Sequence, residues 1–137
     1  MIDSNFIKNN IFNISNVSRE TLNELDDYGK SIVSKNKEIN LISSSTEKSI
    51  NTRHLIDSAQ TIDFIDNSEI STCTDLGSGA GLPGIVLAIL MKHKKPQFKV
   101  IFYEKSFHKS KFLTDMSKKF NLNTEVHRKN IFEEKNL

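Results

Sequence analysis

A ten-residue segment in the middle of the chain, Asp75–Gly84 (DLGSGAGLPG), has the composition of a ligand-binding loop. Its closely spaced glycines let the backbone turn sharply and approach a ligand at a distance that a Cβ atom would prevent. The apolar segment that follows predicts a helix, whose free N–H groups and positive dipole end favour polar or anionic ligand groups. Pro83 suits the start of that helix, where its missing N–H is not needed.

Two carboxylates near this loop narrow the ligand class. Read from Gly79, the loop spells the dinucleotide pattern G-x-G-x-x-G, with Glu104 20 residues after Gly84. Read from Asp75, it spells D-x-G-x-G-x-G, and a carboxylate there repels a pyrophosphate but suits a cofactor with sulfonium and ammonium groups. Glu104 ends the next predicted strand, where it can accept hydrogen bonds from two ribose hydroxyl groups or be a solvated terminal Glu. Asp75 favours the cationic cofactor over the dinucleotide.

The elements that must position these residues alternate between strand and helix. β-branched and alternating segments predict strands at 70–76, 98–104 and 124–127. A helix is expected from about Gly84 to Lys92, and a second, capped by Ser106, has its apolar stripe at 112–120. Strand–helix–strand–helix–strand predicts parallel strands joined by crossover helices, hence an α/β sheet.

Helices are expected ahead of the sheet. Ser18 is a good N-cap, and Val17 and Leu22 are spaced as a hydrophobic staple. The helix that follows carries one apolar stripe, made by Leu22, Leu25, Tyr28, Ile32 and Val33. A second helix is predicted from about Glu47 to Phe64. We divide the chain into an N-terminal helical extension, 1–66, and the first half of a cofactor-binding domain, 67–137, within one structural domain.

Composition excludes several classes of protein. Hydrophobic residues make up 36% of the 137 residues and charged residues 26%, which is ordinary for a globular domain. No apolar run approaches the ~18 residues of a membrane helix. The first ten residues, MIDSNFIKNN, lack a basic region followed by an apolar core, so we do not expect a secretory signal. The single cysteine, Cys73, excludes an internal disulfide framework and is expected to be a reduced core thiol. We expect a cytoplasmic location and no membrane partner.

Charge is distributed unevenly along the chain. Residues 1–91 contain 7 Lys and Arg against 12 Asp and Glu, whereas residues 92–129 contain 11 against 3. A basic C-terminal third indicates either a polyanionic partner or a solvated lysine-rich surface. If the partner exists, the predicted basic face consists of Lys92, Lys94, Lys95, Lys105, Lys109, Lys111 and Arg128.

Four segments occur in a fixed order and spacing: 40–43 (NLIS), 52–58 (TRHLIDS), 75–84 (DLGSGAGLPG) and 104–113 (EKSFHKSKFL). The third, read from Asp75, resembles motif I of class I methyltransferases in general. Together the four resemble one bacterial family, the glucose-inhibited division protein B family of small-subunit ribosomal RNA guanine-N7 methyltransferases. The resemblance covers about residues 17–132.

The resemblance implies a class I Rossmann-like fold that binds S-adenosyl-L-methionine. The implied cofactor residues are Gly77, Gly79, Leu82, Glu104 and the pair Lys129–Asn130 after the third strand. The family usually has an acidic second residue in that pair, whereas this chain has Asn130, whose amide can still contact the adenine side. It commonly has Asp where this chain has Glu104.

The resemblance also implies an RNA partner, small-subunit ribosomal RNA. Guanine N7 carries an available lone pair at neutral pH, so no catalytic acid or base is expected and rate comes from positioning. Lys105, Lys109 and Lys111 are candidate RNA contacts. Arg53 and His54 either face the target guanine and its phosphates or are structural, with Arg53 paired to Asp57. A metal site is not expected, because no second ligand is spaced with His54.

A complete class I methyltransferase has seven strands, and this chain supplies three, so we expect a C-terminal truncation. Two alternatives to an RNA methyltransferase remain: a non-catalytic relative that binds nucleosides or RNA, and a nicotinamide-dinucleotide domain. Asp75 argues against the second alternative, and the early chain end favours the first over full catalysis. A monomer is expected. If the chain is a fragment, we expect the 137 residues alone to be poorly soluble or molten, because a sheet edge would be unpaired.

Overall fold

Three parallel strands form the sheet at the centre of the protein. The computed structural model describes residues 17–50, 55–62, 65 and 69–133. The strands are β1 (Thr72–Leu76), β2 (Lys99–Tyr103) and β3 (Thr124–His127), paired in the order β1-β2-β3. Cys73 lies opposite Val100, and Phe102 lies opposite Val126. The predicted α/β sheet is confirmed, although β1 begins two residues later than expected and leaves Ile70 49% exposed.

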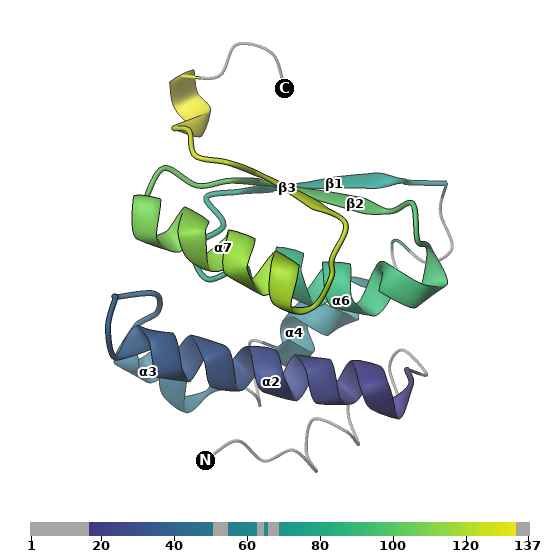
Figure 1. The fold of residues 1–137 in the computed structure, drawn as a ribbon, viewed down its shortest axis with the longest axis horizontal. Coiled ribbons are helices and arrows are strands. Elements are labelled where there is room, and N and C mark those ends of the chain that lie inside the picture. The colour runs from purple at the N-terminus through teal and green to yellow at the C-terminus, as the bar shows by residue number, and fades with distance from the viewer. Residues whose placement is uncertain (1–16, 51–54, 63–64, 66–68, 134–137) are drawn as a thin grey trace.

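Two crossover helices cover one face of the sheet (Figure 1). They are α6 (Gly84–Lys94) between β1 and β2, and α7 (Phe107–Lys119) between β2 and β3. Every residue of α6 from Gly84 to Met91 is buried, because this helix lies between the sheet and a further layer of helices. A helix that is apolar on all sides is expected in such a middle layer.

The helix that opens the described chain, α2 (Arg19–Asn36), packs against α6 from the side away from the sheet (Figure 1). Ser18 is its N-cap, as predicted, and its side chain accepts a hydrogen bond from the Thr21 N–H at 3.2 Å. The staple residues Val17 and Leu22 are both buried. The predicted stripe is also confirmed, since Leu25, Tyr28 and Ile32 are 0% exposed and Val33 packs at the margin. The helical extension therefore shares its core with the sheet domain.

The single helix predicted from 47 to 64 is wrong. The structure instead has α3 (Ser44–Lys48), capped by Ser43, and a separate α4 (Ile56–Gln60) that packs on α6. The Ser49 hydroxyl donates to the carbonyl oxygens of Ser45 and Thr46, at 3.1 and 3.4 Å. A serine that bonds back to the preceding turn competes with helix continuation, and α3 ends there.

The opposite face of the sheet is not covered by any described residue. All the helices in Figure 1 that pack on the sheet lie on one side of it, and Leu76 on the other side is 53% exposed. Within the described residues β1 and β3 each pair with β2 alone, so each has an unpaired edge. A short 3₁₀ helix, η2 (Ile131–Glu133), follows β3. The described part of the chain contains no helix long and apolar enough to cross a membrane.

Candidate functional site

The glycine loop leaves β1 at the carboxyl edge of the sheet and folds back over the end of β2. The Gly77 N–H donates to the Tyr103 carbonyl oxygen at 2.9 Å, which holds the loop against that strand. Gly77 and Gly79 have φ angles of +68° and +56°, and a Cβ atom added at either would meet nothing within 4 Å. The left-handed backbone requires glycine, and the space in front of it is open. We call this open turn at Gly77 and Gly79 the cradle.

The other two glycines of the loop serve packing instead. A Cβ atom on Gly81, whose φ is +96°, would lie 2.9 Å from Leu113 Cδ2. A Cβ atom on Gly84 would clash with the Phe102 ring and lie 2.7 Å from Asp75 Oδ2. The sequence pattern does not distinguish these glycines, whereas the structure separates positions that face open space from positions of close packing.

Leu82 and Pro83 connect the loop to α6. Leu82 is partly buried against the core and is joined to Pro83 by a cis peptide bond. Pro83 is the N-cap of α6, with Gly84 as the first helical residue. The proline thus lies one position earlier than the first-turn position that the sequence suggests. Of the two, Leu82 is the predicted cofactor residue.

Asp75 lies at the end of β1, partly buried behind the loop. Its Oδ2 atom accepts a hydrogen bond from the Gly84 N–H at 3.1 Å, and its carbonyl oxygen accepts one from the Ser78 hydroxyl at 2.9 Å. Burial raises the pKa of Asp75 to about 6, with a further increase from the nearby Glu104 charge, although the Gly84 bond opposes the rise. A carboxyl group in this position gains from a proton or a cation and would repel an anionic ligand.

Glu104 follows β2 and is only 7% exposed, so the solvated alternative for this residue is wrong. Its Oε2 atom accepts from the Gly79 N–H and its Oε1 atom from the Ser106 N–H, both at 2.9 Å. The side chain therefore ties the cradle to the start of α7. Each carboxylate oxygen has a second lone pair, so both oxygens can still accept a hydrogen bond from a ligand hydroxyl group.

Sequence reasoning missed Tyr28, which it placed only in the apolar stripe of α2. The Tyr28 hydroxyl donates to the Ala80 carbonyl oxygen at 2.7 Å, in the interior and across 52 positions of the chain. Burial, and then the Asp75 charge, raise the pKa of Tyr28 well above its ordinary value. A neutral phenol thus holds the far side of the loop. No local pattern signals this contact.

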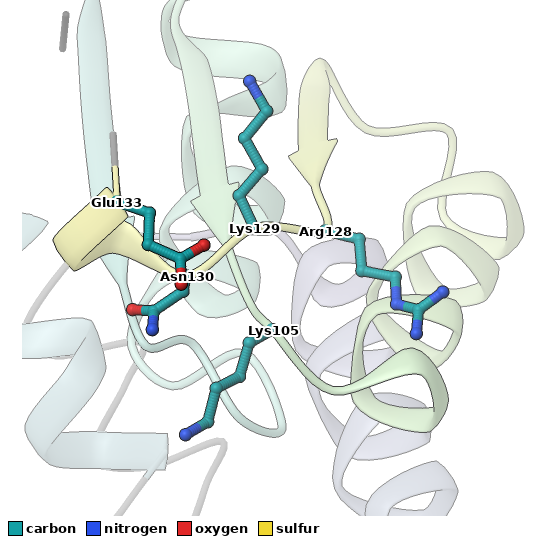
Figure 2. A pocket seen from close by; sticks show the side chains of 5 residues that line it. All are labelled: Lys105, Arg128, Lys129, Asn130 and Glu133. Atoms are coloured by element: carbon teal, nitrogen blue, oxygen red, sulfur yellow. The ribbon is translucent and has the colours of Figure 1, made fainter. Parts of the chain in front are cut away.

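A cavity of about 550 Å³ opens at the same edge of the sheet, beyond Glu104. It is lined by the pair Lys129–Asn130 together with Lys105, Arg128 and Glu133 (Figure 2). Asn130 Oδ1 accepts from the Phe132 N–H at 3.1 Å and so begins η2. In Figure 2 the side chains of Arg128 and Lys129 extend away from Asn130. The structure thus brings Lys105 and the predicted pair to one cavity.

The predicted basic face is divided between opposite edges of the sheet. Lys105 and Lys111 lie near the carboxyl edge, and Lys109 is partly buried in the first turn of α7. At the other edge, Lys92 Nζ bonds Glu24 and the Phe120 carbonyl oxygen, and Lys95 Nζ bonds the Ile65 carbonyl oxygen. The reason is that α6 runs antiparallel to the strands, so its basic C-terminal turn lies at their amino ends.

Two groups of polar residues lie outside this site or outside the described part of the chain. Arg53 and His54 lie outside the described residues. Glu20, Glu24 and His93 have ligand-type atoms within 4.8 Å of one another, a grouping that the sequence did not reveal. Lys92 Nζ lies 3.2 Å from Glu24 Oε2, so an ammonium group already accompanies this cluster, and the ion pair joins α2 to α6.

A parallel sheet with crossover helices, a glycine-rich turn after its first strand and an acid after its second is the arrangement of a Rossmann-like fold of the methyltransferase type. Comparison with known proteins agrees. The family model described as GidB, rRNA small subunit methyltransferase G, matches residues 21–136. The chain belongs to this family.

Proteins named ribosomal RNA small subunit methyltransferase G are similar to the chain. The one from Pelagibacter ubique (strain HTCC1062) is 50% identical over 125 residues, which is 89% of this chain and 58% of the relative. Those from Cereibacter sphaeroides (strain ATCC 17025 / ATH 2.4.3) and Rickettsia akari (strain Hartford) are 43% and 41% identical, and cover 82% and 80% of this chain and 53% and 54% of the relatives. The chain spans about half the length of the curated relatives it matches.

Proposed function

We propose that the protein binds S-adenosyl-L-methionine and methylates N7 of a guanine in small-subunit ribosomal RNA. In this proposal the cradle at Gly77 and Gly79, together with Leu82, binds the amino acid part of the cofactor. Glu104 accepts hydrogen bonds from the ribose hydroxyl groups, and the pair Lys129–Asn130 borders the adenine. Asp75 supplies negative charge behind the loop.

The observation that carries the proposal is the open cradle flanked by two carboxyl groups. Gly77 and Gly79 face open space, while Asp75 and Glu104 each accept a hydrogen bond from the backbone of this loop or its helix. Burial raises the pKa of Asp75, and a nearby cation would favour its ionised form. A cofactor with sulfonium and ammonium groups supplies such a cation, whereas a pyrophosphate would not. The residues present therefore fit S-adenosyl-L-methionine.

In the proposed reaction the protein orients the two reactants and transfers no proton. When bound, S-adenosyl-L-methionine supplies an electrophilic methyl group on a sulfonium cation. Guanine N7 has an available lone pair at neutral pH, so we assign no catalytic acid or base to the chain. The cradle and Glu104 fix the donor end, and the basic carboxyl edge fixes the RNA. Positioning of this kind can account for about 7–11 kcal/mol of a reaction barrier.

The RNA contacts in this proposal are Lys105, Lys109 and Lys111, together with Arg53 and His54, which precede α4. Lysines hold phosphates without reading sequence, which suits a target guanine in a single-stranded or incompletely folded region. We assign the protein to the cytoplasm, because its proposed substrate is the small ribosomal subunit. We further propose that it acts as a monomer. The second candidate, a non-catalytic nucleoside or RNA binder, uses the same residues without turnover.

Calorimetric titration with S-adenosylhomocysteine and with NAD tests the cofactor class. We expect binding of the former only, and loss of that binding in Gly77→Ala, since the added Cβ enters the cradle. Asn121→Ala is the matched control, because Asn121 also has a positive φ, +53°, but lies after α7 away from the loop. Tight NAD binding without S-adenosylhomocysteine binding would refute the proposal.

A second assay separates the enzyme from the non-catalytic binder. Ribosomal RNA from the small subunit is incubated with the full-length protein and S-adenosyl-L-methionine carrying a labelled methyl group. The digested nucleosides are then analysed by mass spectrometry. Labelled 7-methylguanosine supports the proposal. Cofactor binding with no labelled nucleoside would instead support the binding module.

A further inference from the structure

An exposed aromatic ring lies at the start of α7, beside the proposed cofactor cavity. Phe107 is 51% exposed although it is a large apolar side chain in an ordered helix. The Arg128 guanidinium carbon lies 5.1 Å from the centre of its ring, and the His108 ring stands edge-on to it at 5.4 Å. The ring and the guanidinium group thus form a partly exposed cation–π pair.

This pair borders a groove along the outer edge of the sheet. The groove has a volume of about 400 Å³ and lies between α7 and the end of β3. Its lining consists of Phe107, Ser110, Lys111, Thr114, Val126 and Arg128. Arg128 also lines the cavity that contains Lys129 and Asn130, so this residue borders both hollows. A ligand in the groove would therefore lie next to the proposed cofactor cavity.

The charge around the groove favours an anionic partner. Lys111 and Arg128 line the groove, and Lys105 and Lys129 line the adjoining cavity together with one acid, Glu133. Asp115 is 3.1 Å from Lys111 Nζ in an exposed i, i+4 ion pair, an arrangement that contributes little and opens readily. An exposed aromatic ring beside cationic side chains is a typical binding surface for an unpaired base and its phosphates.

We infer that this groove binds the single-stranded RNA segment next to the target guanine, with one unpaired base stacked against the Phe107–Arg128 pair. Lys105 and Lys111 contact the flanking phosphates. This inference rests on the proposed function, because it assumes that the polyanionic partner is RNA. The exposed ring and its cations favour single-stranded RNA over a peptide, because every nucleotide carries both a planar base and a phosphate.

The test measures binding of a fluorescently labelled 12-nucleotide single-stranded RNA by anisotropy, using the full-length protein. Phe107→Ala should weaken binding about tenfold, as loss of one base-stacking contact does, without changing the salt dependence. Phe107→Tyr should bind normally because it keeps the ring. Phe132→Ala is the matched control, since Phe132 is 94% exposed but lies on η2 outside the groove.

Charge removal gives an independent signature. Lys111→Ala and Arg128→Ala should each reduce the slope of log affinity against log salt by about 0.7, the value for one phosphate contact on a single strand. A duplex RNA of the same length should bind more weakly than the single strand, because its bases cannot stack on the protein. Each of these results supports the inference.

The inference is overturned if Phe107→Ala binds RNA like the wild type, or if Phe132→Ala loses as much affinity. It is also overturned if a polyglutamate peptide binds with the same dependence on Phe107. Titration with S-adenosylhomocysteine separates this failure from that of the proposed function. Normal cofactor binding with no role for Phe107 refutes the groove alone, whereas absence of cofactor binding in the wild type refutes the proposed function.

Discussion

Replacing Asp75 with asparagine should stabilise the protein while impairing cofactor binding. The pKa of Asp75 is raised from 3.8 to about 6, which corresponds to about 3 kcal/mol of cost for ionising it in the native state. Because the group is only partly buried, solvent screening reduces this figure to about 2 kcal/mol. Asparagine has nearly the same shape, carries no charge, and can still accept the hydrogen bond from the Gly84 N–H.

The effect has a definite pH dependence. The unfolded chain ionises Asp75 near pH 3.8 and the native state near pH 6, so the native state binds more protons between these values. The contribution of protonated Asp75 to the free energy of unfolding is therefore complete below pH 3.8 and is lost as the pH rises through about 6. The stability advantage of Asp75→Asn over the wild type should then be about 1 kcal/mol larger at pH 7.5 than at pH 5.

Urea unfolding of both proteins without cofactor, at pH 5 and pH 7.5, measures this difference. Asp115→Asn is the matched control, because the same substitution is made at an exposed position on α7, away from the loop. Equal unfolding midpoints for Asp75→Asn and wild type at pH 7.5 would refute the reasoning. An advantage that is no larger at pH 7.5 than at pH 5 would refute it as well.

Three further predictions concern the packing behind the loop. Tyr28→Phe leaves the buried Ala80 carbonyl oxygen unpaired and should lower the free energy of unfolding by about 1–3 kcal/mol in urea titrations, so an unchanged midpoint would contradict the role of this bond. Gly84→Ala places a Cβ atom against the Phe102 ring and should cost about 1–3 kcal/mol in the same assay; a stable variant would show that the ring can move. Burial and the Asp75 charge raise the pKa of the Cys73 thiol. This thiol should therefore react with a disulfide reagent slowly in the native protein at pH 7.5 and quickly in urea, and equal rates would argue against its burial.

Local features of the fold were predictable because their causes lie within a few residues. Ser18 and Ser106 cap helices by accepting N–H groups three residues on, and both caps are present in the structure. The period-2 segments form strands, and the parallel order follows from the helices between them. Ser49 was the exception, since its hydroxyl bonds to the preceding turn and ends a helix that periodicity alone extends.

The positions of Asp75, Gly77, Gly79 and Glu104 in a ligand-binding turn were determined by the sequence, because residue type and spacing at a strand end are local properties. The contacts and burial that distinguish these residues from one another were decided by the tertiary structure. Only the packed fold places Tyr28 behind Ala80, buries Glu104 against the Gly79 N–H, and distinguishes cradle glycines from packing glycines.

Tertiary structure also decided which basic residues act together. Sequence order groups the lysines of 92–95 with those of 105–111, but a crossover helix runs antiparallel to its strands and carries its two ends to opposite edges of the sheet. Conversely, Phe107 and Arg128 are far apart in the chain and meet because β2 and β3 end side by side. Contacts between distant residues depend on the path of the chain in space, which composition and spacing do not encode locally.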